Sequence, residues 1–217
     1  MSACEKSGHW QLALNLLSLM PEAGVVPDQM TYNAAISACE EGGRWQLALN
    51  LLSLMPKAKV VPNEITYSNA ISSCKEGGQW QLALRLLSSM PDMRVMANQI
   101  SYTAAITACK NGGQWQLALG LLSSMPDMGF IPNEISYSAV ITACDKGGQW
   151  QMALGLLSSM PQMILIPDEI CYSATMNACE KAGQLQLPPG LISDMTAACL
   201  RTTLFLRSCS SPATASR

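Results

Sequence analysis

Six of the nine cysteines recur every 35 residues, and a regular row of thiols could bind a metal ion or form disulfides. The row consists of Cys4, Cys39, Cys74, Cys109, Cys144 and Cys179. Zinc sites commonly combine C-x2-C pairs with histidines, but no C-x2-C occurs and His9 is the only histidine. Equivalent positions on packed helices lie about 8–10 Å apart, beyond the roughly 7 Å that the Cα atoms of a disulfide allow. We therefore expect reduced core cysteines, with no metal and no other cofactor.

Residue sets for catalysis are also missing from the sequence. There is no recognisable Ser/His/Asp combination, and the recurring Gly-Gly-Gln-Trp string is typical of a turn between helices, not of a phosphate-binding loop. The H-x-E and C-x-x-C strings of a zinc deaminase are both absent. We expect a chain without enzymatic activity.

The 35-residue spacing extends to other residue types and organises the whole sequence. The string W-Q-[LM]-A-L begins at Trp10, Trp45, Trp80, Trp115 and Trp150. Tyrosine recurs with the same period at Tyr32, Tyr67, Tyr102, Tyr137 and Tyr172, and proline at Pro21, Pro56, Pro91, Pro126 and Pro161. Self-similarity at this period is typical of a solenoid built from supersecondary repeats.

Each unit contains two predicted helices. In the first helix, residues 31–40, Tyr32, Ala35, Ile36 and Cys39 lie on one apolar face at helical spacing. Glycines 42 and 43 end it, and the second helix, residues 44–55, is apolar nearly all round and ends at Pro56. Helices this short are marginal alone, so we expect an all-α, right-handed solenoid whose stability is collective.

The repeat boundaries predict four parts of the chain. Residues 29–168 form four complete repeats, 29–63, 64–98, 99–133 and 134–168, after a partial first repeat in residues 1–28. Residues 169–190 form a degenerate fifth repeat, because Leu185 replaces tryptophan and Pro188-Pro189-Gly190 interrupts the second helix. Residues 191–217 form a C-terminal cap and flexible tail, in which 191–195 begin a short helix. The partial repeat suggests a fragment of a longer array; a genuine start with a frayed helix is the alternative.

Composition limits the partners. The chain has 49% hydrophobic and 13% charged residues, enough apolar sequence to bury a core. A formal net charge of −2 and a pI of about 5.4 offer no basic excess for a phosphate backbone, which counts mildly against nucleic acid. The N-terminal ten residues lack the apolar core of a signal peptide, and no apolar run reaches the roughly 18 residues of a membrane span. We expect a soluble chain in a reducing compartment.

The recurring motif resembles the pentatricopeptide repeat (PPR) family. The pattern over residues 1–187 reads [TS]-Y-[NST]-A…I…A-C-[EK]…G-G-[QR]-W-Q-L-A-L…M-P…[IV]-P-[ND], whereas the W-x2-L-G-x2-Y string of the tetratricopeptide class is absent. The resemblance implies a P-type-like array without a catalytic domain that holds single-stranded RNA, one base per repeat, on a concave surface lined by the first helices. It also implies a mitochondrial or plastid location and a role in RNA processing, stability, translation or editing, although no transit peptide is visible.

In this family, two polar positions per repeat are held to choose the base: the residue after the tyrosine and the last residue of the unit. We call these two residues a reader pair. The implied pairs are Asn33 with Asn63, Ser68 with Asn98, Thr103 with Asn133, and Ser138 with Asp168, while Asp28 and Ser173 are half-pairs. The family's code then gives 5′-YAAG-3′, where Y is a pyrimidine. The acidic and amide residues just before each first helix are also good N-caps, and the two roles can coexist.

The family also sandwiches each base between apolar side chains two residues before the tyrosine. These residues are Met30, Ile65, Ile100, Ile135 and Ile170, and packing between repeats is an equally good explanation for them. At the end of the first helix, where the family often has a lysine near phosphates, this chain has Lys6, Glu41, Glu76, Asn111, Lys146 and Lys181. We therefore expect weaker and less salt-sensitive RNA binding than in a basic groove.

Two further expectations concern partners. The resemblance implies protein partners that supply catalysis, with no membrane and no DNA among the ligands. The competing class is a protein-interaction scaffold of the tetratricopeptide kind, which the acidic pI favours.

Overall fold

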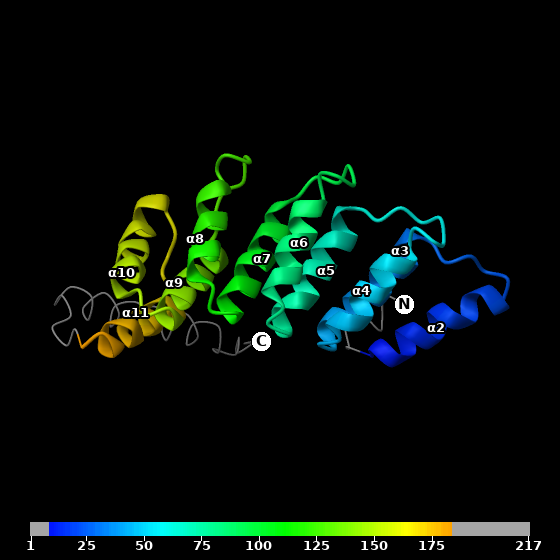
Figure 1. Cartoon of the computed structure of the whole chain (residues 1–217), viewed down its shortest axis with the longest axis horizontal. Helices are drawn as coiled ribbons and strands as arrows, with labels where there is room; N and C mark the ends of the chain where they lie inside the picture. The colour runs from blue at the N-terminus through cyan, green and yellow to red at the C-terminus, as the bar shows by residue number, and fades with distance from the viewer. Residues whose placement is uncertain (1–8, 184–217) are drawn as a thin grey trace, which may run out of the picture. The chain divides into compact units, whose positions relative to one another are not determined.

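The computed structural model describes residues 9–183, and this part of the chain consists of helices and loops without a strand. The chain divides into two compact units, Met1–Pro132 and Asn133–Arg217. From α3 onward, longer and shorter α-helices alternate along each unit (Figure 1). The predicted all-α solenoid of helix-turn-helix repeats is confirmed. Several expectations lie outside the described residues: the thiol of Cys4, Lys6, Leu185, the interruption at 188–190, and the tail 191–217.

In the first unit, the helices are α2 (Trp10–Glu22), α3 (Gln29–Glu41), α4 (Trp45–Leu54), α5 (Glu64–Glu76), α6 (Trp80–Ser89), α7 (Gln99–Asn111) and α8 (Trp115–Ser124). The first helices of successive repeats, α3, α5 and α7, pack side by side. Each also packs on the second helix of its own repeat and on that of the preceding repeat.

The second unit repeats the same arrangement. Its helices are α9 (Glu134–Lys146), α10 (Trp150–Ser159), the 3-10 helix η1 (Pro161–Met163) and α11 (Glu169–Lys181). Here α9 and α11 pack together, and α10 contacts both of them.

Each first helix begins two residues earlier than residues 31–40 predict. Asp28 is the N-cap of α3, and its side chain accepts a hydrogen bond from the backbone N–H of Thr31 at 2.8 Å. Residues 29–31 therefore form the first turn, because the cap bonds to the third helical residue. The predicted start at Thr31 was wrong, because the buried apolar face begins only at Tyr32, after this partly exposed first turn.

The two glycines that follow each first helix have different roles. Gly43 has a φ of +64°, in the left-handed region that favours glycine, and thus ends α3 as predicted. Gly42 has an ordinary φ of −82°, so its backbone does not require glycine. A Cβ at Gly77, the equivalent residue one repeat later, would lie 2.5 Å from Cδ1 of Trp45. Gly77 therefore makes room for the tryptophan of the preceding repeat.

This contact explains the tryptophan row. Cβ atoms on Gly42 and Gly112 would likewise overlap Trp10 and Trp80. The tryptophans are half-buried, and Trp10 packs against the core between α3 and α4. Trp10, Trp45 and Trp80 therefore pack between successive repeats.

The helices α4, α6, α8 and α10 each end one residue before the predicted end, with the proline outside the helix, and among the described second helices only α2 runs through its proline. Helix α4 ends at Leu54, before Pro56, and α2 continues through Pro21 to Glu22. The chain reverses at a left-handed residue three positions after each proline: Gly24, Lys59, Arg94, Gly129 and Ile164. At Lys59 the turn is closed by the N–H of Val60, which donates to the Met55 carbonyl at 2.9 Å. These turns, not the prolines, set the direction of the loop to the next repeat.

The core follows the predicted apolar face. Tyr32, Ala35, Ile36 and Cys39 are buried, with Ala48, Leu51 and Met55 from the second helix packed against them. The second helix, although apolar nearly all round, is not buried on every side, because Leu54 at its end is 44% exposed. One side of each second helix faces solvent. Single exposed apolar residues such as Leu54 are common on protein surfaces.

Buried thiols are expected to be unreactive in the folded chain. Cys39, Cys74, Cys109 and Cys144 are free and buried, and burial raises the pKa of each to about 11. At pH 8, roughly one such thiol in a thousand is ionised. Peptide-resolved mass spectrometry after brief iodoacetamide treatment should find these four unmodified until denaturant is added. Rapid modification under native conditions would contradict the burial of the row.

Candidate nucleic-acid interface

The residue before each first helix caps that helix in every described repeat. The side-chain oxygens of Asp28, Asn63, Asn98, Asn133 and Asp168 accept from the third helical N–H at 2.8–3.0 Å. At Asp28 the hydroxyl and then the backbone N–H of Thr31 stabilise the carboxylate and lower its pKa. The predicted capping role is confirmed, and it fixes these five side chains at the starts of the first helices.

Two of the reader pairs are hydrogen-bonded within themselves. Asn33 on α3 donates through Nδ2 to Oδ1 of Asn63, the cap of α5, at 3.3 Å. One repeat later, the Ser68 hydroxyl donates to Oδ1 of Asn98 at 3.2 Å. Residues 30 positions apart in the sequence thus lie together, because the first helices of neighbouring repeats pack side by side.

The members of the other two reader pairs contact other residues of their own units. In the second unit, Ser138 and Asp168 both interact with the thiol of Cys171, and burial is the main cause that raises the pKa of this thiol to about 12. Thr103 lies on α7 in the first unit, where its hydroxyl donates to the Gln99 carbonyl at 2.8 Å, and Asn133 caps α9 in the second unit. The half-pair residue Ser173 is exposed on α11.

The residues that follow the tyrosine in each reader pair differ in how far they are exposed to solvent. Ser68 is only 3% exposed, whereas Asn33, Thr103 and Ser138 are partly exposed. The Ser68 hydroxyl is therefore too buried to contact a ligand in solvent directly, whereas its hydrogen-bond partner Asn98 is partly exposed. In the second complete repeat, Asn98 is therefore the outward member of the pair, and Ser68 orients its amide.

The apolar residues two positions before the tyrosine project into solvent. Their exposed fractions range from 52% at Ile65 to 78% at Met30, with Ile100, Ile135 and Ile170 between these values. Burial between repeats, the alternative explanation for these residues, does not occur at these positions. The helix starts thus carry one solvent-exposed apolar side chain per repeat.

A second exposed apolar row was missed by sequence reasoning. Residues Val26, Val61, Met96, Ile131 and Ile166 lie in the loops before the caps, and each is 71–81% exposed. The signal that could have found them is the same 35-residue period, four positions before the first apolar row. Each repeat thus presents two apolar side chains close to its cap.

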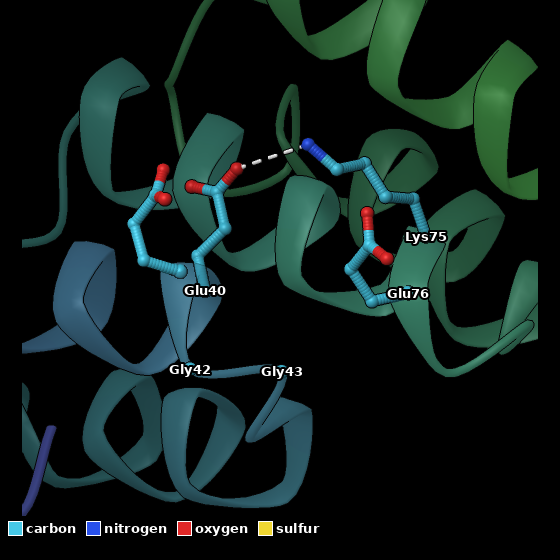
Figure 2. A pocket seen from close by; sticks show the side chains of 6 residues that line it. Glu40, Gly42, Gly43, Lys75 and Glu76 are labelled. Carbon is cyan, nitrogen blue, oxygen red and sulfur yellow. Dashed lines mark hydrogen bonds and ion pairs between the residues drawn. The ribbon is translucent and has the colours of Figure 1, made fainter. Parts of the chain in front are cut away.

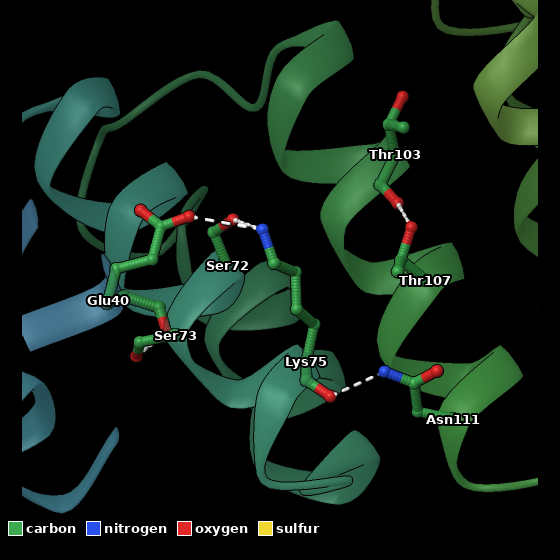
Figure 3. A network of polar contacts seen from close by, with 8 residues as sticks. Glu40, Ser72, Ser73, Lys75, Thr103, Thr107 and Asn111 are labelled. Atoms are coloured by element: carbon green, nitrogen blue, oxygen red, sulfur yellow. Dashed lines mark hydrogen bonds and ion pairs between the residues drawn. The ribbon is translucent and has the colours of Figure 1, made fainter. Parts of the chain in front are cut away.

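The opposite ends of α3 and α5 are acidic. A hollow of 360 Å³ is lined by Glu40, Glu41, Gly42, Gly43, Lys75 and Glu76, and Figure 2 shows the carboxylates gathered there. The Lys75 ammonium lies 3.3 Å from Glu40, and Asn111 donates to the Lys75 carbonyl at 2.7 Å (Figure 3). In the second unit, Lys181 pairs with Asp145 at 2.8 Å. These lysines are already engaged by carboxylates of the preceding repeat.

Neither a metal centre nor a membrane span is found in the part of the chain that the structure describes. Residues 9–183 contain no cluster of three or more His, Cys, Asp or Glu side chains suited to a metal ion. Among the same residues, no helix combines the length and apolar character needed to cross a bilayer.

Three repeat profiles match the sequence. The PPR repeat family profile matches residues 27–76 and 97–146, a pentatricopeptide repeat domain profile matches residues 1–42, and a PPR repeat profile matches residues 65–95 and 135–163. No curated protein sequence is detectably similar to the chain.

Solved PPR structures share the fold at low identity. The PPR domain of protein-only RNase P 1 from Arabidopsis thaliana, in complex with tRNA, aligns with a TM-score of 0.64 and 14% identity over 86% of this chain and 92% of that domain. Maize PPR10 in complex with an 18-nt psaJ RNA element gives a TM-score of 0.69 and 20% identity over 97% of this chain. Only 33% of PPR10 is covered, so the chain spans about a third of that protein's length. These structures share the fold, and the profile matches, which together span most of the sequence, show that the chain belongs to the pentatricopeptide repeat family.

Proposed function

We propose that the chain binds single-stranded RNA sequence-selectively, one base per repeat, without catalysing a reaction itself. The observation that carries this proposal is the repeated combination of an exposed apolar residue and a polar reader pair at the start of each first helix. Apolar side chains can stack on bases, and the amides and hydroxyls beside them can donate to or accept from a base edge. This arrangement recurs with the 35-residue period, so each repeat offers the same kind of contact to one base.

The family's code assigns a base to each pair. Asn33 with Asn63 selects a pyrimidine, the pairs beginning with Ser68 and Thr103 select adenine, and the pair beginning with Ser138 selects guanine. The proposed core is 5′-YAAG-3′, read in organellar RNA metabolism by a mitochondrial or plastid protein, with catalysis supplied by partner proteins. Stacking of four bases contributes about 1–3 kcal/mol of binding free energy per base. Association costs translational and rotational freedom, which offsets much of this gain, so we expect this chain alone to bind RNA weakly.

Fluorescence anisotropy tests the proposal directly. A short labelled RNA that contains YAAG should bind more tightly than a scrambled RNA of the same composition at the same salt concentration. Equal affinity for the two RNAs would exclude base reading by these pairs. The alternative, a protein scaffold, rests on the acidic hollow and predicts no specific binding to either RNA.

Reversing the charge of the acidic hollow should strengthen binding and increase its salt dependence. Glu41 and Glu76 occupy the positions at which the family often carries lysine, and both are exposed. In a Glu41→Lys, Glu76→Lys chain, each new phosphate contact should steepen the slope of log K against log salt by about 0.7. Anisotropy titrations at several salt concentrations measure this slope.

The matched control places the same charges elsewhere. Asp92 and Asp127 are exposed in the turns after α6 and α8, so Asp92→Lys with Asp127→Lys changes net charge equally. A slope that steepens as much in the control as in the Glu41→Lys, Glu76→Lys chain would show that only net charge matters.

A further inference from the structure

Gln29, the first residue of α3, joins two repeats through both ends of its side-chain amide. Its Nε2 donates to the carbonyl of Val61 at 2.7 Å, and its Oε1 accepts from Nδ2 of Asn63 at 3.2 Å. Asn63 is the second member of the first reader pair and the cap of α5. Gln29 therefore holds both the loop that leads to the next repeat and the amide proposed to meet the base.

The inner side of the same network is buried. The Thr66 hydroxyl, which has no exposed surface, donates to Oδ1 of Asn33 at 2.6 Å, and Asn33 in turn donates to Asn63 at 3.3 Å. The side chains of Gln29, Asn33, Asn63 and Thr66, from two repeats, thus form one connected set of hydrogen bonds. Because both amides in the pair have partners for their oxygens, their donor and acceptor ends are fixed before any ligand arrives.

The same bridge occurs where a repeat begins with glutamine. Gln99, the first residue of α7, donates through Nε2 to the carbonyl of Ile131 at 3.0 Å, across the same 32 residues as Gln29 and Val61. The repeat between them begins with Glu64, which is exposed. A carboxylate at neutral pH has no hydrogen to donate to the equivalent carbonyl, that of Met96. In this repeat, Asn98 accepts from Ser68 and Ser101, but its Nδ2 has no partner among the described residues.

From this difference we infer that the first residue of each repeat is a positioning residue for base reading, a role that rests on the proposed RNA-binding function. Glutamine clamps the loop and, at Gln29, the reader amide; glutamate at position 64 leaves the loop unclamped and adds a negative charge. A clamped reader loses less conformational freedom when a base binds, so it discriminates between bases more sharply. Base selectivity therefore varies along the array with the identity of this first residue.

Removing the clamp at the first repeat tests the role of Gln29. A Gln29→Met substitution keeps the length of the side chain but removes both hydrogen bonds without adding charge. The ratio of affinities for 5′-CAAG-3′ and 5′-GAAG-3′ should fall about 2- to 10-fold, as expected for the loss of one net hydrogen bond. Discrimination at the second base should not change. Gln81→Met, at an exposed position of α6, is the matched control and should leave both ratios unchanged.

Adding the clamp at the second repeat is the converse test. Both Glu64→Gln and Glu64→Met remove the negative charge, but only Glu64→Gln supplies a donor for the Met96 carbonyl. The preference for adenine over other bases at the second position should rise about 2- to 10-fold in the Glu64→Gln chain relative to the Glu64→Met chain. Overall affinity should rise in both, because both lose the charge.

The outcomes separate this inference from the proposed function. If the unaltered chain binds YAAG more tightly than the scrambled RNA, but Gln29→Met leaves the first-base ratio unchanged and the two Glu64 variants discriminate equally, the positioning role is wrong and base reading stands. A uniform loss of affinity for every RNA with a lower unfolding temperature would show that Gln29 only stabilises the fold, and would also overturn the inference. If the unaltered chain has no preference, both proposals fail together.

Discussion

Replacement of Gly77 by alanine is expected to lower the free energy of unfolding by about 1–3 kcal/mol, the usual cost of forcing extra volume into a packed contact. The new Cβ would lie 2.5 Å from the indole of Trp45, and the indole is half-buried between two repeats and cannot simply swing away. The backbone of Gly77 has an ordinary φ of −82°, so the cost arises from the contact and not from backbone strain. Chemical denaturation followed by circular dichroism measures the change.

A double-mutant cycle identifies the cause. In a Trp45→Ala background, which is itself destabilised by loss of the indole, Gly77→Ala should have little further effect, because the overlapping ring is gone. Gly120→Ala is the matched control: Gly120 is exposed within α8, and a Cβ there would meet no atom within 4 Å. Alanine at position 120 should stabilise the chain by about 0.8–1.0 kcal/mol. Equal costs of Gly77→Ala with and without Trp45 would contradict the proposed contact between repeats.

The second large effect concerns the exposed apolar row at the helix starts. Ile65→Ser combined with Ile100→Ser removes two surfaces on which bases are proposed to stack. Stacking is worth about 1–3 kcal/mol per base, so the affinity for a YAAG-containing RNA should fall about 5- to 150-fold for each base affected. Anisotropy gives the affinity, and the unfolding transition should change little because both side chains are more than half exposed.

A control variant distinguishes stacking from general surface apolarity. Leu54→Ser removes an exposed leucine at the end of α4, outside the helix starts, and should leave RNA affinity unchanged. Unchanged affinity in the double isoleucine variant, with an intact fold, would assign this row to another partner.

The sequence predicts the fold well because one period governs every structural feature. The tyrosine and cysteine positions define the core face of the first helices, and the same face is buried in the structure. The period does not reveal the different roles of two adjacent residues of the same type. Gly42 and Gly43 look alike in the sequence, but Gly43 adopts the left-handed conformation, whereas Gly42 has an ordinary φ and leaves room for the indole of Trp10 from the preceding repeat.

Turn geometry was harder to predict than helix content. The left-handed residue after each second helix is glycine at position 129 but lysine at 59 and isoleucine at 164. A β-branched residue rarely adopts this conformation, so no sequence pattern would assign it there. The recurring 6→1 hydrogen bond, such as Leu165 N–H to the Met160 carbonyl at 2.9 Å, imposes the turn on Ile164 from outside the residue.

The candidate site was predicted in outline and not in detail. The family resemblance named both members of each reader pair, and two pairs are in contact in the structure. The burial of Ser68 and the bridge from Gln29 to Val61 could not be inferred, because both depend on how closely adjacent first helices approach. Hydrogen bonds between repeats therefore add information that the motif of a single repeat does not contain.

One exchange tests the central claim, that each repeat reads one base. Asp168→Asn changes the outer member of the fourth pair and preserves the helix cap, since asparagine and aspartate cap equally well. Anisotropy against four RNAs that differ only at the last base of YAAG should show a preference that moves from guanine to adenine, while discrimination at the first three bases stays as in the unaltered chain. An unchanged preference for the last base, or an equal change at all four positions, would contradict the claim.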